Sequence, residues 1–490
     1  MTDIRFGLVT AFALCATTSL AQDSIAVAIQ LEPPNLDPTG GAAQAIDSVL
    51  YANVFEGLTR FAADGAIVRG LAQSWDISED GLVYRFNLAA GVTFHDGTTM
   101  DAEDVKFSLD RARAEDSTNA QKTLFEGITD VTVVEPLVVQ ITLDQPNGNF
   151  LFNLAWGDAV IVAPESIDDI ANNPVGTGPF TFTDWVQGDR IELARNPDYW
   201  GAAPALETAT FRFIADPTAA FAAVMAEDVD AFVGFPAPEN LPQFEADPRF
   251  QVLVGNTEGE TILSINNKMP PFDDVRVRQA VALAIDRQAI IDGAMFGLGT
   301  PIGTHFAPHN PDYVDLLSRS PHDPDRARDL LADAGFADGF TTTLKLPPPS
   351  YARRGGEIIA SQLREVGIET EITNLEWAQW IEEVFTGKDF GLSIVSHTEP
   401  MDIGVYANPD YYFQYDNPAF QTLMETLNAT TDPAQRSVLL SEAQTIIADD
   451  YVNGYLFELA VATVAKADIQ GLWVHQPTAA VDLTGVRWAN

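Results

Sequence analysis

The stretch that decides the fold is residues 53–112, NVFEGLTRFAADGAIVRGLAQSWDISEDGLVYRFNLAAGVTFHDGTTMDAEDVKFSLDRA. Within it, Asp80-Gly81 is a pair that tolerates the positive φ of a tight hairpin turn. The residues after this turn alternate, and the apolar members are Leu82, Tyr84, Phe86 and Leu88. Period-two alternation is typical of a strand with one buried face. The stretch therefore predicts a β-hairpin.

A capped helix is predicted directly after the hairpin. Asp96-Gly97 makes a second turn, and Asp101 stands where a helix N-cap belongs, with Asp104 three residues later. Val105 and Leu109 then continue one apolar helix face. These features shape the backbone and carry no catalytic chemistry, so the stretch indicates a scaffold.

In this order, the EGL element, the W-x-I-S-x-D-G hairpin, the F-H-D-G turn and the A-E-D-V-x-F-S helix resemble the family 5 extracellular solute-binding proteins. These are the periplasmic receptors of peptide/nickel-type ABC transporters. Three further motifs match the family: GTGPF at 176–180, RNPDYWG at 195–201 and NNKMPPFDDVRVRQAVALAIDRQAII at 266–291. The resemblance covers residues 22–490.

The resemblance implies an α/β fold, the two-lobed periplasmic binding protein of class II, cluster C type, with an extra domain inserted in the first lobe. Lobe I would comprise 22–47, 177–262 and 470–490, the inserted domain 48–176, and lobe II 263–469. The chain would cross between the lobes near 261–266 and again near 469–473.

Other local patterns agree with mixed α/β structure. We predict a strand at 24–30 and a hairpin through 131–143. Helices are predicted after a cap at Asp273 or Asp274, at 356–366, and after the N-cap and N1 pair Asp432-Pro433.

The N-terminus resembles a cleaved signal peptide at 1–21. Arg5 precedes a short apolar core, and Ser19-Leu20-Ala21 gives a small-x-small cleavage site. Lipidation at Cys15 is disfavoured because Leu14 before it is bulky. Since Cys15 is the one cysteine, the mature chain would lack disulfides, thiol catalysis and Cys-ligated zinc. No later stretch is apolar for the roughly 20 residues that span a bilayer, so we predict a periplasmic protein without membrane insertion.

The charge is extreme, because 27 basic and 70 acidic residues leave a net charge of −43. Nucleic acid and anionic lipid surfaces are therefore poor partners. Two interpretations stay open: a solvated acidic surface suited to salty surroundings, which we favour, and a cationic ligand.

The search for catalytic motifs finds no G-x-S-x-G elbow, no H-E-x-x-H, no Walker loop and no G-x-G-x-x-G. His305 and His309 are four residues apart, but Pro308 between them prevents a shared helix face. A polar loop is the favoured interpretation of this pair. We predict no metal, no cofactor and no enzymatic activity.

Binding residues follow from the resemblance. Peptide-binding relatives pair an Asp of lobe II with the ligand's ammonium group, which points to Asp402, with Glu399 as second choice. Arg353 and Arg354 stand where relatives carry a basic residue for the ligand's carboxylate. Aromatic wall candidates are Trp380, Trp377, Tyr406, Tyr411, Tyr412 and Trp156. The alternatives are an exposed loop carboxylate for Asp402, surface charges for the arginines, and a core position for Trp377 or Trp380.

The sequence therefore predicts a monomeric receptor that captures small peptides in an interlobe cleft and delivers them to an ABC permease. Within binding proteins, a nickel chelate, an opine, a sugar or another organic cation stays open as the solute. From a different class, an exported hydrolase is the remaining alternative.

Overall fold

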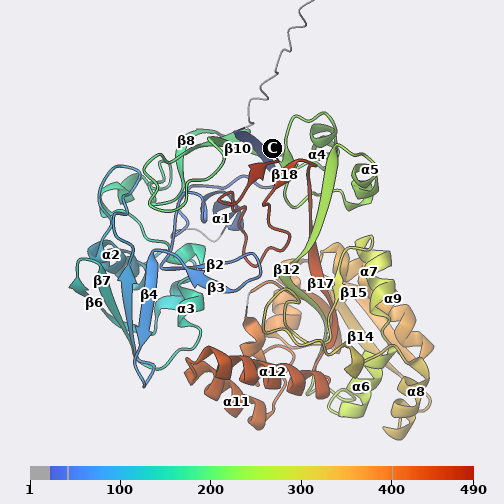
Figure 1. Cartoon of the computed structure of the whole chain (residues 1–490). Coiled ribbons are helices and arrows are strands. Elements are labelled where there is room, and N and C mark those ends of the chain that lie inside the picture. The colour runs from blue at the N-terminus through green and yellow to red at the C-terminus, as the bar shows by residue number, and fades with distance from the viewer. Residues whose placement is uncertain (1–22, 41–42, 400, 490) are drawn as a thin grey trace, which may run out of the picture.

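The computed structural model describes residues 23–40, 43–399 and 401–489. The predicted signal peptide lies outside the described residues. Figure 1 shows three bodies: one at the left around β4–β7, one at the top around β8 and β10, and one at the lower right around β14 and β15. Within the described part of the chain, no helix is both long and apolar enough to span a bilayer.

One mixed sheet runs through the upper and lower-right bodies in the order β15-β14-β16-β12-β17-β11-β1-β10-β9-β8, with β13 beside β17. Its upper strands are β1 (Ser24–Ile29), β8 (Phe180–Val186), β9 (Arg190–Arg195), β10 (Thr208–Phe213) and β11 (Ala231–Phe232). Its lower strands are β13 (Thr300–Pro301), β14 (Phe340–Leu346), β15 (Ile368–Asn374) and β16 (Leu392–His397). The predicted first strand is thus confirmed as β1.

Two long strands connect the upper and lower parts of the sheet. They are β12 (Phe250–Ile265) and β17 (Gly454–Lys466), which pair antiparallel and run from the upper body to the lower one in Figure 1. Their register shifts between Asn256 and Glu260, so residues 257–259 lie outside the regular ladder. Irregular pairing of this kind bends a strand. The bend lies ahead of 261–266, where the sequence predicted the first crossing.

The left body has its own four-stranded antiparallel sheet, ordered β4 (Ala72–Ile77), β5 (Val83–Leu88), β7 (Val138–Leu143) and β6 (Ile128–Glu135). The two predicted hairpins form here, and Gly81 takes a positive φ of 69° in the first turn. Helix α2 (Ala102–Arg113) carries the predicted cap, since the Asp101 carboxylate accepts from the N–H of Glu103 at 2.8 Å and Asp104 accepts from Asp101 N–H at 2.8 Å. The local elements of the fold-deciding stretch are confirmed.

Helices cover the lower sheet and flank the other bodies. They are α1 (Gln44–Leu50), α3 (Phe150–Asn153), α4 (Pro217–Met225), α5 (Leu241–Glu245), α6 (Val275–Ala284), α7 (Arg287–Met295), α8 (Pro324–Asp333), α9 (Ser350–Glu365), α10 (Trp377–Trp380), α11 (Pro418–Ala429) and α12 (Pro433–Asp449). Asp274 caps α6 and Asp432 caps α12, as predicted. Short pairs β2 (Thr59–Phe61) with β3 (Ile67–Arg69) and β18 (Ile469–Gln470) with β19 (Arg487–Trp488) complete the described elements.

Helix α9 begins six residues before its predicted start at Gly356, so Arg353 and Arg354 belong to the helix instead of preceding it. The predicted helix start at Gly356 was therefore wrong. Gly355 and Gly356 are buried, and a Cβ at Gly356 would lie 2.4 Å from the Leu346 side chain of β14. Glycine is needed there because the helix packs closely on the sheet.

A second junction joins the left body to the lower one, away from β12 and β17. Gly148 N–H donates to the carbonyl of Asn428 at 2.6 Å, at the end of α11. The Arg436 guanidinium donates to the carbonyls of Leu427 and Thr430, at 2.8 and 3.0 Å, and also to the side-chain oxygen of Asn149. A side chain at Gly148 would collide with Thr430 and Arg436, so the two bodies meet backbone to backbone.

Candidate functional site: a cavity between the two halves of the sheet

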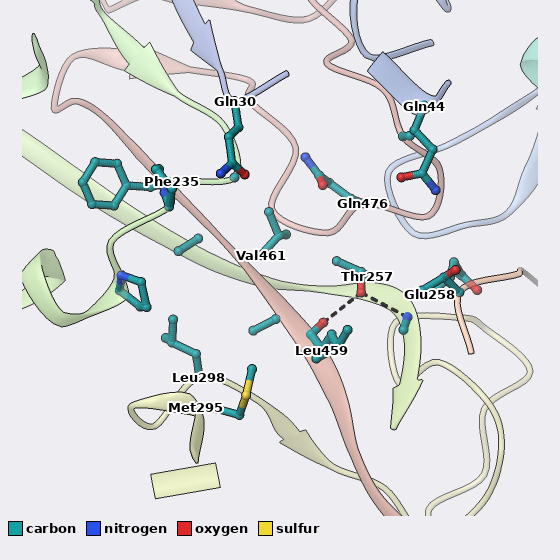
Figure 2. A pocket seen from close by; sticks show the side chains of 18 of the residues that line it. Gln30, Gln44, Phe235, Thr257, Glu258, Met295, Leu298, Leu459, Val461 and Gln476 are labelled. Carbon is teal, nitrogen blue, oxygen red and sulfur yellow. Dashed lines mark hydrogen bonds between the residues drawn. The ribbon is translucent and has the colours of Figure 1, made fainter. Parts of the chain in front are cut away.

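A cavity of about 540 Å³ lies where β12 and β17 pass from the upper body to the lower one. Residues 257–259 of β12 and 459–462 of β17 form one of its walls (Figure 2). The upper body supplies Gln30, Gln44, Asp47, Phe235 and the segment 476–479. The lower body supplies Met295, Phe296, Leu298, Ser350 and Thr398. The volume is within the range of small-molecule sites, roughly 300–1,000 Å³.

The lining combines apolar and amide-bearing side chains. Figure 2 shows Phe235, Met295, Leu298, Leu459 and Val461 around the cavity, with Gln30, Gln44 and Gln476 along its upper side. Thr257 donates its hydroxyl to the Leu459 carbonyl at 3.0 Å and accepts from Gly259 N–H at 3.0 Å, which fixes the irregular part of β12. A primary amide both donates and accepts hydrogen bonds, so this wall suits a solute that carries amides.

Two polar atoms at the cavity wall have no hydrogen-bond partner among the described residues: the indole Nε1 of Trp156 and Oδ1 of Asp47. Both atoms are buried. Burial, and then the nearby carboxylate of Asp158, raises the pKa of Asp47 well above its usual value. An unpaired buried donor or acceptor costs roughly 1–3 kcal/mol. One donor and one acceptor with unused hydrogen-bonding capacity therefore lie just behind the cavity surface.

The predicted ammonium partner, Asp402, lies below the cavity in a network of its own. Its Oδ1 lies 2.6 Å from Nε2 of His305, and its Oδ2 lies 2.8 Å from Nδ1 of His397. Burial would raise the pKa of Asp402, but the two imidazoles outweigh burial and hold that pKa well below its usual range. Both carboxylate oxygens are thus already occupied by histidine.

Hydroxyl groups complete this network on either side. The Tyr406 hydroxyl lies 3.2 Å from His305 Nδ1 and accepts from the Asn453 amide at 3.1 Å. The Tyr412 hydroxyl lies 3.1 Å from His397 Nε2 and 2.6 Å from the Ser264 hydroxyl. Every polar side-chain atom of the three central residues therefore has a partner within the lower body.

In contrast to Asp402, the carboxyl groups on β12 and β17 are poorly supplied with hydrogen-bond donors. Glu260 of β12 and Glu458 of β17 are opposite each other in the ladder, and His397 of β16 is opposite Glu260 on its other side. Glu458 is fully buried. Among the described residues, its two carboxyl oxygens and Oε2 of Glu260 have no partner that meets hydrogen-bond geometry, although the Gly259 N–H is close enough to Glu458 to lower its pKa slightly. Burial, and then mutual repulsion with neighbouring carboxylates, raises the pKa of both groups well above the usual value. Nearby Glu258, which lines the cavity, lies 2.7 Å from His309 Nε2.

The remaining polar candidates are distributed around the cavity. Glu399 is exposed, and its carboxylate accepts from the N–H of Thr398, a lining residue, at 3.2 Å. Arg353 donates to the Leu375 carbonyl and to Glu376 instead of lining the cavity. The Arg354 guanidinium lies 5.5 Å from the centroid of the Phe296 ring, and Phe296 lines the cavity.

Among the aromatic candidates, Trp156 lines the cavity. Trp380 is 5% exposed and donates its indole N–H to Ser393 at 3.0 Å, so it belongs to the core, the alternative that the sequence left open. Trp377 is 42% exposed and packs edge-on against Trp380. Tyr406 and Tyr412 are buried in the same core, and Tyr411 packs on Tyr412 and Phe385.

Sequence reasoning did not identify Asp47, Glu260 or Glu458. Asp47 sits in an ordinary short helix, and acidic residues are too frequent in this chain to attract attention singly. One signal was present: Glu258 and Glu260 interrupt GNTEGETILSI, a stretch that is otherwise buried strand. Two acidic residues in such a strand are unusual and point to a site.

Comparison with known proteins gives the family. The model described as "Bacterial extracellular solute-binding proteins, family 5 Middle" matches residues 66–418. The chain is 31% identical to the glutathione-binding protein GsiB of Pectobacterium atrosepticum, over 96% of this chain and 95% of that protein.

Two solved structures share the fold. HbpA2 from Haemophilus parasuis has a TM-score of 0.86 at 24% identity, covering 95% of this chain and 100% of that chain. The ABC transporter-associated periplasmic binding protein DppA from Helicobacter pylori, in complex with peptide STSA, has a TM-score of 0.71 at 23% identity, covering 96% of this chain and 99% of that chain. The predicted two-lobed α/β fold and the family resemblance are confirmed. The chain belongs to the bacterial extracellular solute-binding proteins of family 5.

Proposed function

We propose that this protein is the periplasmic receptor of an ABC importer and that its solute is a small peptide, held in the cavity between the two halves of the sheet. The observation that carries the proposal is the pair of unpartnered polar atoms at the cavity wall, Trp156 Nε1 and Asp47 Oδ1. A peptide offers carbonyl oxygens to an N–H donor, and amide or ammonium groups to a carboxylate.

The rest of the lining supports a peptide of variable sequence. Gln30, Gln44 and Gln476 can each donate to and accept from a peptide backbone, and the apolar wall around Phe235 and Val461 suits side chains. The relatives agree with this class of solute, since one is named as a glutathione-binding protein and another was solved with peptide STSA. Glutathione is therefore the first peptide to try.

In this proposal Asp47 replaces Asp402 as the partner of the solute's ammonium group. Both oxygens of Asp402 are already engaged by imidazoles, whereas Asp47 keeps a free one. A cation beside Asp47 would also relieve the repulsion from Asp158. Arg354, above Phe296 at the cavity wall, is the proposed partner of the solute's carboxylate, and Glu399 stays a second candidate for its ammonium group.

We further propose that the upper body is lobe I, with the left body inserted in it, and that the lower body is lobe II. The lobes would turn about the irregular part of β12 at 257–259 and the facing part of β17. A solute that touches both lobes stabilises the closed arrangement by its differential affinity for it. Export with cleavage near Ala21, a monomeric state, delivery to a permease and the absence of turnover complete the proposal.

Native mass spectrometry of gently purified protein tests the class of solute. A ladder of added masses that is lost on denaturation and fragments to amino-acid residues is the expected result. One sharp added mass without amino-acid fragments would replace the peptide with a single non-peptide solute. Release of a chemically altered peptide on incubation would favour a hydrolase.

Calorimetric titration with a tripeptide then tests Asp47. We expect Asp47→Asn to weaken binding of the free tripeptide about tenfold, because one charge-assisted hydrogen bond is worth roughly 1.5–3 kcal/mol. Binding of the N-acetylated tripeptide should change little. Trp156→Phe is the matched variant on the donor side, since it keeps the ring and removes the N–H, and it should weaken both peptides alike. Equal losses for both peptides in Asp47→Asn would remove Asp47 from the ammonium role.

A further inference from the structure

Three side chains of the lower body bring together atoms that bind transition metals, and a fourth lines the same recess. One ring nitrogen each of His305 and His397 and a carboxylate oxygen of Asp402 lie within 4.8 Å of one another. The nitrogens in contact with Asp402 are His305 Nε2 and His397 Nδ1. Glu260 is the ladder neighbour of His397 and lines the same small recess as His305 and Asp402. Its Oε2 is buried without a hydrogen-bond partner among residues 23–40, 43–399 and 401–489, and the residue is 4% exposed. The recess thus has a built-in free ligand atom.

The outer contacts of the two histidines are those that a metal site needs. Metal-binding histidines usually donate their second ring N–H to an acceptor that fixes ring orientation. Here the second nitrogens, Nδ1 of His305 and Nε2 of His397, face the hydroxyls of Tyr406 and Tyr412 at 3.2 and 3.1 Å. Those hydroxyls are held in turn by Asn453 and Ser264. Both rings are therefore fixed with one nitrogen directed at Asp402.

The local charge also favours a cation. Glu258, Glu260, Glu458 and Asp402 interact electrostatically with one another in the same buried region. Within the described ranges, none of these four carboxyl groups pairs with a lysine or an arginine, and their ionic contacts are with histidine alone. Buried charges in proteins are normally paired or coordinate a metal.

We propose that His305, His397, Asp402 and Glu260 form a binding site for a divalent transition-metal ion of the Zn²⁺ type, held by the protein's own side chains. Two imidazoles and two carboxylates suit Zn²⁺ in a four-coordinate arrangement. On binding, His305 carries its proton on Nδ1 and His397 on Nε2, where the tyrosine oxygens accept them. A proton on Glu260 leaves to solvent. The sequence predicted no metal, because its ligands are spread over three separated segments.

Titration of the chelator-treated full-length mature protein with Zn²⁺ alone tests the site by calorimetry, and Co²⁺ absorption reports on ligand geometry. We expect one equivalent to bind, with Co²⁺ bands of a four-coordinate nitrogen and oxygen environment. His397→Gln and Glu260→Gln should each weaken Zn²⁺ binding at least tenfold. Tyr406→Phe, which removes only the outer contact of His305, should weaken it about 10- to 100-fold.

His322→Gln is the matched control, because His322 lies outside this cluster and is 40% exposed. It should bind Zn²⁺ as the parent protein does. The proposal is overturned if no stoichiometric Zn²⁺ binds, if Glu260→Gln folds normally and binds unchanged, or if His322→Gln loses the ion instead. Since the titration uses no peptide, its failure leaves the peptide assignment standing, and a failed peptide titration leaves the metal result standing.

Discussion

Asp402, whose side chain is 11% exposed, and the fully buried Glu458 are both carboxyl groups, and the protein accommodates them in opposite ways. Asp402 accepts from two imidazoles, and its pKa lies well below the usual value. Neither oxygen of Glu458 has a hydrogen-bond partner in the part of the chain that the structure describes, and burial raises its pKa well above the usual value. The charged form of Asp402 is favoured because hydrogen-bond donors replace the lost water, and burial favours the neutral form of Glu458. Burial alone therefore does not decide the charge of a group; the donors around it do.

Removing one of the two imidazoles that donate to Asp402 should change stability more than any other variant considered below. We expect His305→Leu, studied in metal-free buffer with chelator, to lower the free energy of unfolding by about 3–5 kcal/mol, because it leaves a buried charge without one of its partners. Denaturant unfolding measures the change. His305→Gln, which keeps a donor, should lose clearly less. Equal losses in the two variants would mean that His305 stabilises the protein through packing and not through its hydrogen bond to the charged Asp402.

The variant Glu458→Gln tests the raised pKa of Glu458 through the pH dependence of stability. The pKa of Glu458 is raised on folding, so the stability that its proton provides is complete below the unfolded value near 4.3 and falls as pH rises toward the folded value. Glutamine does not titrate. In metal-free buffer, the free energy of unfolding of Glu458→Gln should therefore rise relative to that of the parent protein. The rise should be up to about 1.4 kcal/mol per pH unit above pH 4.

The contribution of Asp402 to stability should change with pH in the opposite direction. Its pKa is lowered on folding, so its contribution is present above the unfolded value near 3.9 and is lost on acidification below it. Unfolding curves of the parent protein and Glu458→Gln from pH 3 to 8 measure both effects. A difference between the two proteins that stays constant above pH 4 would show that Glu458 is charged in the folded state.

Tyr412→Phe should make the smallest of these changes. The hydroxyl of Tyr412 connects His397 with Ser264, and removing it leaves both polar groups without that partner. A loss of about 1–2 kcal/mol is expected from hydrogen-bond energetics. Thermal unfolding at pH 7 measures it, with Tyr411→Phe as the neighbouring tyrosine control. A loss of stability as large as that of His305→Leu would mean that the Tyr412 hydroxyl, and not the histidines alone, is needed to stabilise the charge of Asp402.

The sequence predicted the elements that depend on neighbours in the chain. The cap at Asp101, the turn at Gly81 and the cap at Asp274 are local, so short patterns were sufficient. The start of α9 was missed because Gly356 is required by contact with Leu346 of β14, which the local pattern does not contain.

The site depended on longer-range pairing. His305 reaches Asp402 across 97 residues, and Glu260 meets Glu458 only through the register of β12 with β17. The sequence alone did not show that Asp402 pairs with His305 or that Glu458 lies opposite Glu260, because acidic residues are so numerous. The family resemblance selected Asp402, and the structure shows that both of its carboxylate oxygens are occupied by imidazoles.

The junction at Gly148 has a kinematic consequence. If the upper and left bodies move together as the proposed lobe I, two rigid lobes joined at two separated places can rotate only about the line through those places, unless one junction parts. The long strands provide one such place, and the backbone contact of Gly148 with Asn428, held by Arg436, provides the other. Lobe motion must either use this line as its axis or break the Gly148 contact first. In the second case, residues that never line the cavity set how fast it opens.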